Sequence, residues 1–282
     1  QAQTDLVGPP GSVDFGASVT ILANGNLVIT DPNYSTGLTG SVGAVYLYDG
    51  ETGAQISTLT GSTAGDRVGG EGVLALANGN YIIYSFYCQH AAADAGAVTW
   101  CSGTTGCSGT VSPANSLVGP GFDWSGERQV VTPLSNGNYV VVCTLCDVGG
   151  IIDAGAVTWA DGDTGVTGFP SAANSLVGSS AGDYVGASGV TPLPNGNYMV
   201  GTETWINGTV SYAGAATWCD GDSGCIGPVT SANSLVGSTE GDRIGRGYAL
   251  PNGNYYVWSM AWDNGDAVDA GSITWCPGES GC

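Results

Sequence analysis

Acidic side chains recur at fixed places along this 282-residue chain, and paired carboxylates are the groups that hydrolyse glycosides. A catalytic acid needs surroundings unlike those of its partner. These acids instead repeat with the sequence around them. We therefore predict that they accept hydrogen bonds in turns, that the chain is not an enzyme, and that a glycoside hydrolase is the weaker alternative. One set lies in Gly-Asp/Glu turns and the other precedes Gly-Ala-Val-Thr-Trp-like segments: Asp66, Glu127, Asp183 and Asp242; Asp94, Asp153 and Asp269.

Short Asp-Gly-Asp turns offer oxygen ligands of the kind that calcium prefers. The pairs are Asp161 with Asp163 and Asp220 with Asp222. The same sequence suits any tight turn. We expect no cofactor, with calcium at these turns as the open candidate.

Three aromatic residues, Tyr34, Trp205 and Trp262, fall near loops of variable sequence, where binding functions concentrate. Stacked sugars favour such side chains, so these residues are candidates for glycan binding, although structural burial is the favoured interpretation. Asn33 and Asn207 match the N-glycosylation sequon in the same loops.

The nine cysteines follow a pattern. Pairs six residues apart recur on either side of one turn, and the other repeats replace both members together, so the two positions should touch and form hairpin disulfides. A zinc site would need ligands from separate repeats. We predict a further bridge from Cys88 to Cys146, with Cys143–Cys146 as the alternative. Such disulfide use indicates an oxidising, extracellular compartment. The hairpin pairs are Cys101–Cys107, Cys219–Cys225 and Cys276–Cys282.

The charge is strongly negative: 24 acidic residues oppose four arginines, giving a net charge of -20. This field repels phosphate backbones and anionic lipid headgroups, so nucleic-acid binding is excluded as a function class. No apolar run approaches the roughly 20 residues that a membrane helix needs. We expect a secreted or cell-surface protein, and a first residue other than Met suggests a mature product.

These residues must be positioned by a repeated unit. The tripeptide Asn-Gly-Asn begins at residues 24, 78, 136, 195 and 252, and each copy is followed by a segment of the Gly-Ala-Val-Thr-Trp type. Each unit of about 57 residues predicts four short strands, with Asn-Gly in a type I′ turn between the first two. Four-stranded units repeated radially make a β-propeller. We therefore predict an all-β, five-bladed propeller that forms one domain over residues 1–282.

The fifth unit lacks a sequence for its fourth strand, whereas residues 4–8 match that strand elsewhere. We predict that Asp5, Leu6 and Val7 complete the fifth blade, in the same chain or in a neighbouring copy.

The segments Asp14-Phe-Gly-Ala-Ser, Asn26-Leu-Val-Ile-Thr and Gly43-Ala-Val-Tyr-Leu resemble the FG-GAP repeat of integrin-α-type propellers. The whole chain is also similar to a repeat of secreted or surface proteins of bacteria, with Asn-Ser-Leu-Val-Gly, Asn-Gly-Asn-Tyr-Val-Val and Ala-Gly-Ala-Val-Thr-Trp blocks. This resemblance implies a propeller in an extracellular setting.

The leading hypothesis is a structural or adhesive propeller that polymerises with itself into an extracellular filament through strand donation. The alternative is a lectin-like protein that binds cell-surface glycans, with or without calcium.

Overall fold

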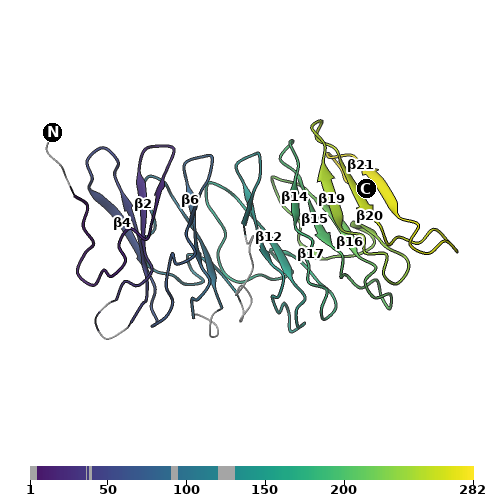
Figure 1. Ribbon diagram of the computed structural model, residues 1–282, viewed down its shortest axis with the longest axis horizontal. Coiled ribbons are helices and arrows are strands. Elements are labelled where there is room, and N and C mark those ends of the chain that lie inside the picture. The colour runs from purple at the N-terminus through teal and green to yellow at the C-terminus, as the bar shows by residue number, and fades with distance from the viewer. Residues whose placement is uncertain (1–4, 36, 38–39, 90–94, 120–130) are drawn as a thin grey trace. The chain divides into compact units, whose positions relative to one another are not determined.

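The computed structural model describes residues 5–35, 37, 40–89, 95–119 and 131–282 (Figure 1). All regular structure in these residues is β, and it forms five sheets of three to five strands. The prediction of an all-β chain with one sheet per repeat is confirmed, and this arrangement is consistent with a five-bladed propeller. Asp94 and Glu127 lie outside the described residues.

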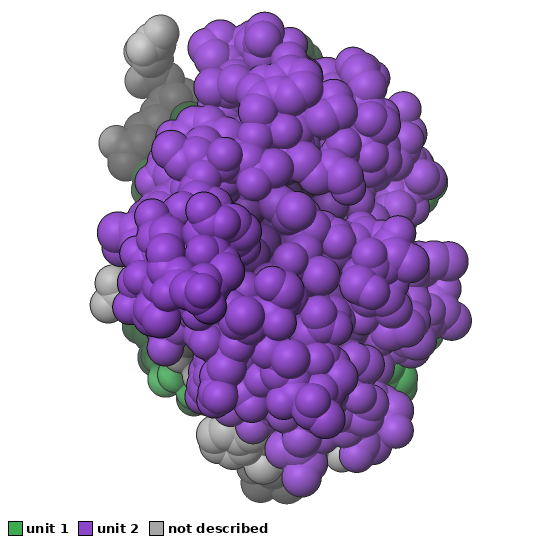
Figure 2. Space-filling model, turned by 90° about the vertical axis from the view of Figure 1, so that its right-hand side faces the viewer, with its two compact units in different colours: residues 1–125, 162–169 green, residues 126–161, 170–282 purple. Residues whose placement is uncertain are grey.

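The residues gather into two compact units, which Figure 2 shows in different colours. Unit 1 comprises residues 1–125 and 162–169, and unit 2 comprises residues 126–161 and 170–282.

Unit 1 contains the first two sheets. The first sheet has the order β1-β2-β3-β4-β8, and the second has the order β5-β6-β7-β9. The strand bounds are β1 Ser18–Ile21, β2 Leu27–Asp31, β3 Ala44–Tyr48, β4 Gln55–Thr60, β8 Gly109–Thr110, β5 Val73–Ala75, β6 Tyr81–Ser85, β7 Ala97–Cys101 and β9 Leu117–Val118.

Unit 2 contains the other three sheets. Their orders are β10-β11-β12-β13-β17, β14-β15-β16-β18 and β19-β20-β21. The bounds are β10 Val131–Pro133, β11 Tyr139–Cys143, β12 Ala156–Ala160, β13 Leu176–Val177, β17 Gly227–Pro228, β14 Val190–Pro192, β15 Tyr198–Thr202, β16 Ala215–Cys219, β18 Ser234–Val236, β19 Arg246–Ala249, β20 Tyr255–Ser259 and β21 Ser272–Cys276.

The Asn-Gly-Asn hairpins differ from the predicted type I′ turn. In the fourth repeat only Gly196 has a positive φ, 97°. The Gly196 N–H donates to the Leu193 carbonyl at 3.1 Å, and the Leu193 N–H donates to the Asn197 carbonyl at 2.8 Å. This pattern is a type I turn followed by a left-handed glycine. The first Asn therefore needs no left-handed conformation, and its side-chain oxygen accepts the Asn197 N–H instead.

Successive repeats are also joined by short parallel pairings that alternation of apolar residues does not reveal. In unit 1, β4 pairs in parallel with β8 of the following repeat. In unit 2, β13 pairs in parallel with β17 of the following repeat. The fourth strand of a repeat thus also contacts the repeat after it.

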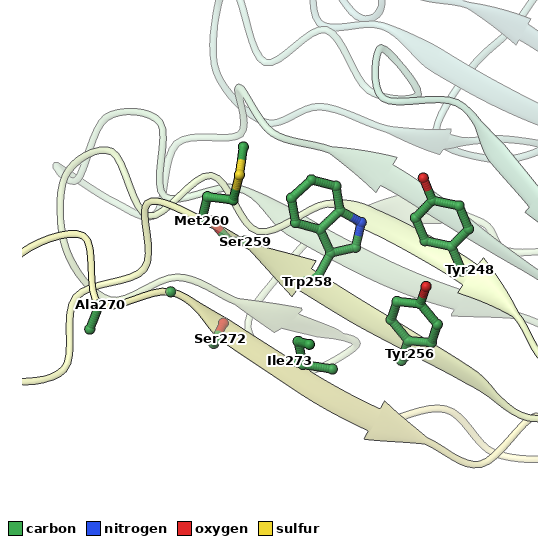
Figure 3. Close-up of a pocket in the computed structure, with 9 residues that line it drawn as sticks. Tyr248, Tyr256, Trp258, Ser259, Met260, Ala270, Ser272 and Ile273 are labelled. Carbon is green, nitrogen blue, oxygen red and sulfur yellow. The ribbon is translucent and has the colours of Figure 1, made fainter.

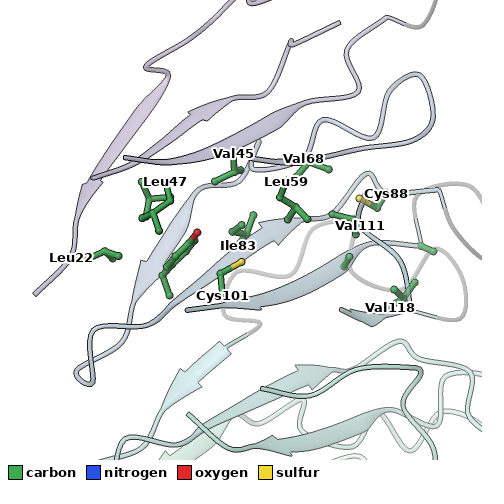
Figure 4. Close-up of a cluster of buried hydrophobic side chains, with 14 residues drawn as sticks. Leu22, Val45, Leu47, Leu59, Val68, Ile83, Cys88, Cys101, Val111 and Val118 are labelled. Carbon is green, nitrogen blue, oxygen red and sulfur yellow. The ribbon is translucent and has the colours of Figure 1, made fainter. Parts of the chain in front are cut away.

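The core of unit 1 lies between its two sheets (Figure 4). Val45 and Leu47 from the first sheet pack with Ile83 and Cys101 from the second, and all four are buried. Aliphatic side chains at alternate strand positions fill this layer, as expected for a sheet that is covered on that face. Burial of each such side chain stabilises the fold by about 1.5–3 kcal/mol.

The predicted seam strand is not formed by the residues that the structure describes. Asp5, Leu6 and Val7 have no regular secondary structure, and the fifth sheet has three strands. Leu6 packs instead against the aromatic cluster of the first sheet, which includes Tyr46 and Tyr48.

Candidate functional sites

The acids of the Gly-Asp turns are buried acceptors of backbone hydrogen bonds. One Asp183 oxygen, Oδ2, accepts the N–H groups of Ser179 and Ser180, each at 2.8 Å. The other, Oδ1, accepts the N–H of Ile206 at 3.0 Å. A buried carboxylate is tolerated because these donors replace water. Each acid ties its own turn to the loop that follows strand two of its repeat. Two further buried acids repeat the arrangement: Asp66 and Asp242.

Two of these carboxyl groups differ in acidity. Burial raises the pKa of Asp183 above its ordinary value, because desolvation outweighs its backbone hydrogen bonds. Burial acts in the same direction on Asp242, but hydrogen bonds from the Thr239 hydroxyl and from backbone N–H groups outweigh it and lower the pKa of Asp242. The Thr239 hydroxyl lies 2.6 Å from Oδ1 of Asp242. In both cases the carboxylate accepts hydrogen bonds from backbone N–H groups of its own turn, as the repeated sequence predicts.

The short Asp turns are closed by hydrogen bonds. Asp220 Oδ1 accepts the N–H groups of Asp222 and Ser223 at 2.8 and 3.0 Å. Oδ1 of Asp222 accepts from Asn136 of the preceding repeat, and Oδ1 of Asp163 accepts from Asn78. Over the described ranges, no group of three or more His, Cys, Asp or Glu residues could hold a metal ion. Calcium at Asp161, Asp163, Asp220 and Asp222 stays a prediction.

The structure forms all three predicted hairpin disulfides, each at one end of a strand-three-to-strand-four turn. The predicted bridge from Cys88 to Cys146 is wrong. Cys146 pairs with Cys143, with a Cα–Cα distance of 5.4 Å, and Cys88 is a buried free thiol. The alternative pairing was thus correct, because β11 ends at Cys143 and the following turn returns the chain to it. Four disulfides indicate an oxidising, extracellular type of environment.

The aromatic residues proposed for glycan binding pack inside the units. Trp205 is only 3 % exposed and belongs to a core cluster of unit 2, so the prediction that it stacks on a sugar is wrong. Trp262 packs against a second core cluster, and Tyr34 packs against the aromatic cluster of the first sheet. A large side chain at this repeated position fills space beneath the variable loop.

Both sequon asparagines are half-buried and have bonded amides. The amide nitrogen of Asn33 donates to Asp14, and that of Asn207 donates to the Gly237 carbonyl at 3.1 Å. Modification at either site would have to break this hydrogen bond.

A contact that sequence reasoning missed connects neighbouring repeats. In unit 2, the carbonyl of Gly221 accepts hydrogen bonds from three side chains of the preceding repeat: Asn136 at 2.8 Å, Asn138 at 2.9 Å and Trp159 at 2.8 Å. The Gly278 carbonyl receives the equivalent bonds from Asn195, Asn197 and Trp218. Recurrence of Asn, Asn and a turn Gly in each repeat, with Trp in four of the five, was the available signal.

The fifth sheet carries an open surface in unit 2. Tyr248, Tyr256 and Trp258 project from β19 and β20, and Ile273 projects from β21, around a cavity of about 710 Å³ (Figure 3). The rings of Tyr248 and Tyr256 are stacked with centroids 5.3 Å apart. Ile273 is 77 % exposed, whereas Ala216 at the equivalent position of the fourth sheet is 3 % exposed. The fifth repeat covers the fourth sheet, and among the described residues of unit 2 none gives the fifth sheet an equivalent cover.

None of the described segments forms a long apolar helix of the kind that crosses a lipid bilayer.

The chain also matches solved structures at low sequence identity. Virginiamycin B lyase from Staphylococcus aureus is 11% identical, with a TM-score of 0.39, and the match covers 92% of this chain and 68% of the lyase. A streptogramin B lyase is 8% identical, with a TM-score of 0.38, and the match covers 91% of this chain and 66% of that one. A eukaryotic initiation factor is 10% identical, with a TM-score of 0.46 and coverage of 96% and 56%.

These comparisons correct the prediction that the chain is not an enzyme. Lyases are among the similar structures, so this architecture gives no ground for setting catalysis aside. At such low identity the likeness assigns no activity either.

No curated protein matches the chain. One family model, described as "Repeat of unknown function (DUF5650)", matches it five times, at residues 21–70, 75–123, 133–187, 192–246 and 249–282. The predicted resemblance to FG-GAP repeats is not confirmed. The five matches account for most of the sequence and follow the five repeats, so the chain belongs to the family of repeats of unknown function DUF5650.

Proposed function

We propose that this chain is a subunit of a secreted or cell-surface assembly that grows head to tail by strand donation. In this arrangement, Asp5, Leu6 and Val7 of one copy add a fourth strand to the fifth sheet of another. Strand addition supplies backbone hydrogen bonds and fixes the register. A head-to-tail contact that does not close on itself produces a filament.

The observation that carries the proposal is the unfilled fifth sheet. In the fourth sheet, β18 pairs with β16, and Leu235 of β18 packs against the core of the fifth repeat. The fifth sheet ends at β21 and leaves Ile273 and Trp275 exposed, the latter at 58 %. Large exposed apolar surfaces mark interaction sites in folded proteins.

The opening segment has the features of the strand that the fifth sheet lacks. Leu6 packs against the buried cluster of the first sheet that includes Ile29 and Tyr48. Leu235 packs against a cluster that includes the equivalent residues of the fifth sheet, Val257 and Cys276. Leu6 thus occupies the place of a strand-four leucine from a preceding repeat. Val7, next to it, is 75 % exposed and available to a partner.

The register of the donated strand follows from the fourth sheet. There, Ala215, Ala216 and Thr217 lie opposite Val236, Leu235 and Ser234. The equivalent pairing would place Val7 opposite Ser272, Leu6 opposite Ile273, and Asp5 opposite Thr274. The buried Thr217 hydroxyl bonds to Ser234 at 2.7 Å. The Thr274 hydroxyl would donate to the Asp5 carboxylate in the same way.

The junction between copies would differ from the internal ones at one point. A Cβ added to Gly201 would lie 1.9 Å from the Gly245 carbonyl of the next repeat, and the equivalent residue in the fifth sheet is Trp258. The loop before β1 of the incoming copy must therefore leave room for the indole of Trp258. Trp258 would therefore exclude a partner loop that approaches as closely as the internal loops do, and would select a partner whose loop leaves space for the indole.

The test compares the wild type with Leu6→Pro, and with Leu6→Val as the matched control. At the equivalent position of an internal repeat the Val118 N–H donates away from strand three, to Gly168, so the pairing N–H of the donated strand is that of Leu6. Proline removes this N–H, whereas valine retains strand pairing. Light scattering after size exclusion, with electron microscopy, should show concentration-dependent assemblies for the wild type and Leu6→Val, and monomers for Leu6→Pro. A wild type that stays monomeric at every concentration, including one that seals its own fifth sheet, would overturn head-to-tail growth. Normal assembly of Leu6→Pro would overturn strand donation.

A further inference from the structure

Several bulky residues of unit 2 adopt a backbone conformation that favours glycine. Asp153, Tyr184, Tyr212 and Arg243 have φ angles of 51°, 50°, 52° and 50°. This left-handed region is strained for most side chains, and for a tyrosine it is an outlier. Glycine would remove the strain, and the chain has 49 glycines, yet it has none at these four positions.

The backbone explains the conformation but not the choice of side chain. The Tyr184 N–H donates to the Asp153 carbonyl at 3.1 Å, and the Arg243 N–H donates to the Tyr212 carbonyl at 2.9 Å. Each pair therefore joins the loop before strand three of one repeat to the Gly-Asp turn of the next. These bonds use backbone atoms only, so a glycine could make them equally well.

The four side chains contact one another in pairs, with Asp153 and Tyr184 half-buried at the surface. The Tyr184 hydroxyl lies 3.4 Å from Oδ2 of Asp153. The Arg243 guanidinium lies over the Tyr212 ring, 5.5 Å from its centroid. Tyr212 is 49 % exposed, and Arg243 is exposed as well.

The two pairs also lie near one another. Asp183, which precedes Tyr184, accepts the N–H of Ile206 at 3.0 Å from the loop that continues to Tyr212. The Asp153–Tyr184 and Tyr212–Arg243 pairs therefore lie on adjoining loops of unit 2. In agreement, the Asp153 carboxylate is the main cause of a raised pKa at Tyr184, and the Tyr212 side chain adds to it.

We propose that Asp153, Tyr184, Tyr212 and Arg243 form a binding edge for a neutral polysaccharide. A tyrosine ring presents a flat apolar face and a polar tip, which suits the apolar faces and hydroxyl rims of sugar rings. Tyrosine also supplies contact area at low conformational cost. Asp153 and Arg243 add an acceptor and a planar donor for sugar hydroxyls. Backbone strain is retained where function requires it.

The charge of the chain selects neutral over acidic glycans. With a net charge of -20, the protein repels anionic polymers, whereas uncharged sugars are unaffected by this field. Asp153 would place a further negative charge in contact with the ligand.

A second pair of the same kind occurs in unit 1. Arg67, at φ 46°, lies over the ring of the exposed Tyr87 with its guanidinium carbon 6.0 Å from the centroid. Arg67 follows the buried Asp66 just as Tyr184 follows Asp183 and Arg243 follows Asp242. The position after the buried acid thus carries a large side chain in each of these turns, exposed at Arg67 and Arg243 and half-buried at Tyr184.

The experiment measures stability and binding in the same variants. Tyr184→Gly and Tyr212→Gly relieve backbone strain, so each should raise Tm by about 2–4 °C. The double variant should lose at least tenfold in affinity for the soluble neutral glucans and mannans used as probes. Tyr212→Asn, which tolerates the left-handed region, should also weaken binding. Ile226→Ala is the control, since it removes another exposed apolar side chain of unit 2 that belongs to neither proposed site, and it should bind as the wild type does.

The contrary outcomes are distinct. Wild-type protein that binds none of the neutral probes, or binds only polygalacturonate as the anionic probe, overturns the proposal. Unchanged binding by the double glycine variant overturns it too. A fall in Tm in both glycine variants would show that the side chains serve the fold. Loss of assembly with unchanged glycan binding would assign the edge to protein contacts and would also overturn the proposal. The binding edge does not depend on the head-to-tail assembly, so either proposal can fail alone.

Discussion

The fourth and fifth sheets of unit 2 are built from the same repeat but meet different surroundings. Trp218 in the fourth sheet donates its indole N–H to the Gly278 carbonyl of the next repeat, 2.9 Å away. Trp275, its counterpart in the fifth sheet, is 58 % exposed. Chemically equivalent residues thus differ in whether another repeat covers them. The comparison teaches that the following repeat supplies much of what stabilises each sheet.

Matched tryptophan substitutions should give the largest difference between the two sheets. Trp218→Ala removes packing and an inter-repeat hydrogen bond, so the free energy of unfolding should fall by about 3 kcal/mol. Trp275→Ala removes an exposed side chain and should cost less than about 0.5 kcal/mol in the monomer. Denaturant unfolding at low protein concentration measures both. Equal losses would mean that the fifth sheet is covered in solution.

Removal of a hairpin disulfide should affect both sheets alike. Cys219–Cys225 and Cys276–Cys282 each close a turn with a sequence separation of six. Chain entropy assigns each about 2 kcal/mol, whatever lies over the sheet. Paired serine variants, compared by denaturant unfolding, should therefore lose similar amounts. A much smaller loss in the fifth sheet would show that cover by the next repeat contributes to the effect of the cross-link.

Two buried acids of successive repeats, Asp183 and Asp242, should respond to pH in opposite directions. The pKa of Asp183 is raised above 3.8, so its contribution to stability falls as pH rises from 3.8 through the higher folded value. The pKa of Asp242 is lowered, so its contribution is present above 3.8 and is lost as pH falls through the lower folded value. For each carboxyl group, the free energy of unfolding changes by at most about 1.4 kcal/mol per pH unit.

Asparagine variants test this difference. Asp183→Asn should be less damaging at pH 6 than at pH 3, and Asp242→Asn should be more damaging at pH 6. The measurement is the free energy of unfolding of each variant relative to the wild type at both pH values. The same trend in both variants would contradict the opposite shifts.

Sequence reasoning found the parts of the fold that repeat. The recurrent motifs predicted five sheets, and the paired replacement of cysteines placed the hairpin disulfides. The turn acids were interpreted as hydrogen-bond acceptors because they obey the repeat, and Asp183 shows that geometry. In each case a feature present in several copies distinguished a structural requirement from chance.

The features that were missed depend on contacts between repeats. β17 consists of Gly227–Pro228, and neither residue signals a strand, so its parallel pairing with β13 could not be predicted. The pairing of Cys146 depends on where β11 ends. The binding edge depends on φ angles that no residue type at those positions suggests. Trp205 was considered for a surface role because the loop near it varies, whereas its side chain is buried in a core cluster of unit 2.

The three-donor carbonyl at Gly221 has a consequence for how this array can change in length. A Cβ at Gly221 would lie 1.9 Å from the Gly196 carbonyl, and Asn136 and Trp159 of the preceding repeat bond to the same turn. The turns that contain Asn136, Gly196 and Gly221 therefore pack against one another in one fixed register. An insertion of a few residues in any one of them would misalign the others. Duplication or loss of a whole repeat preserves every fit, so evolution of such a chain should proceed in complete units.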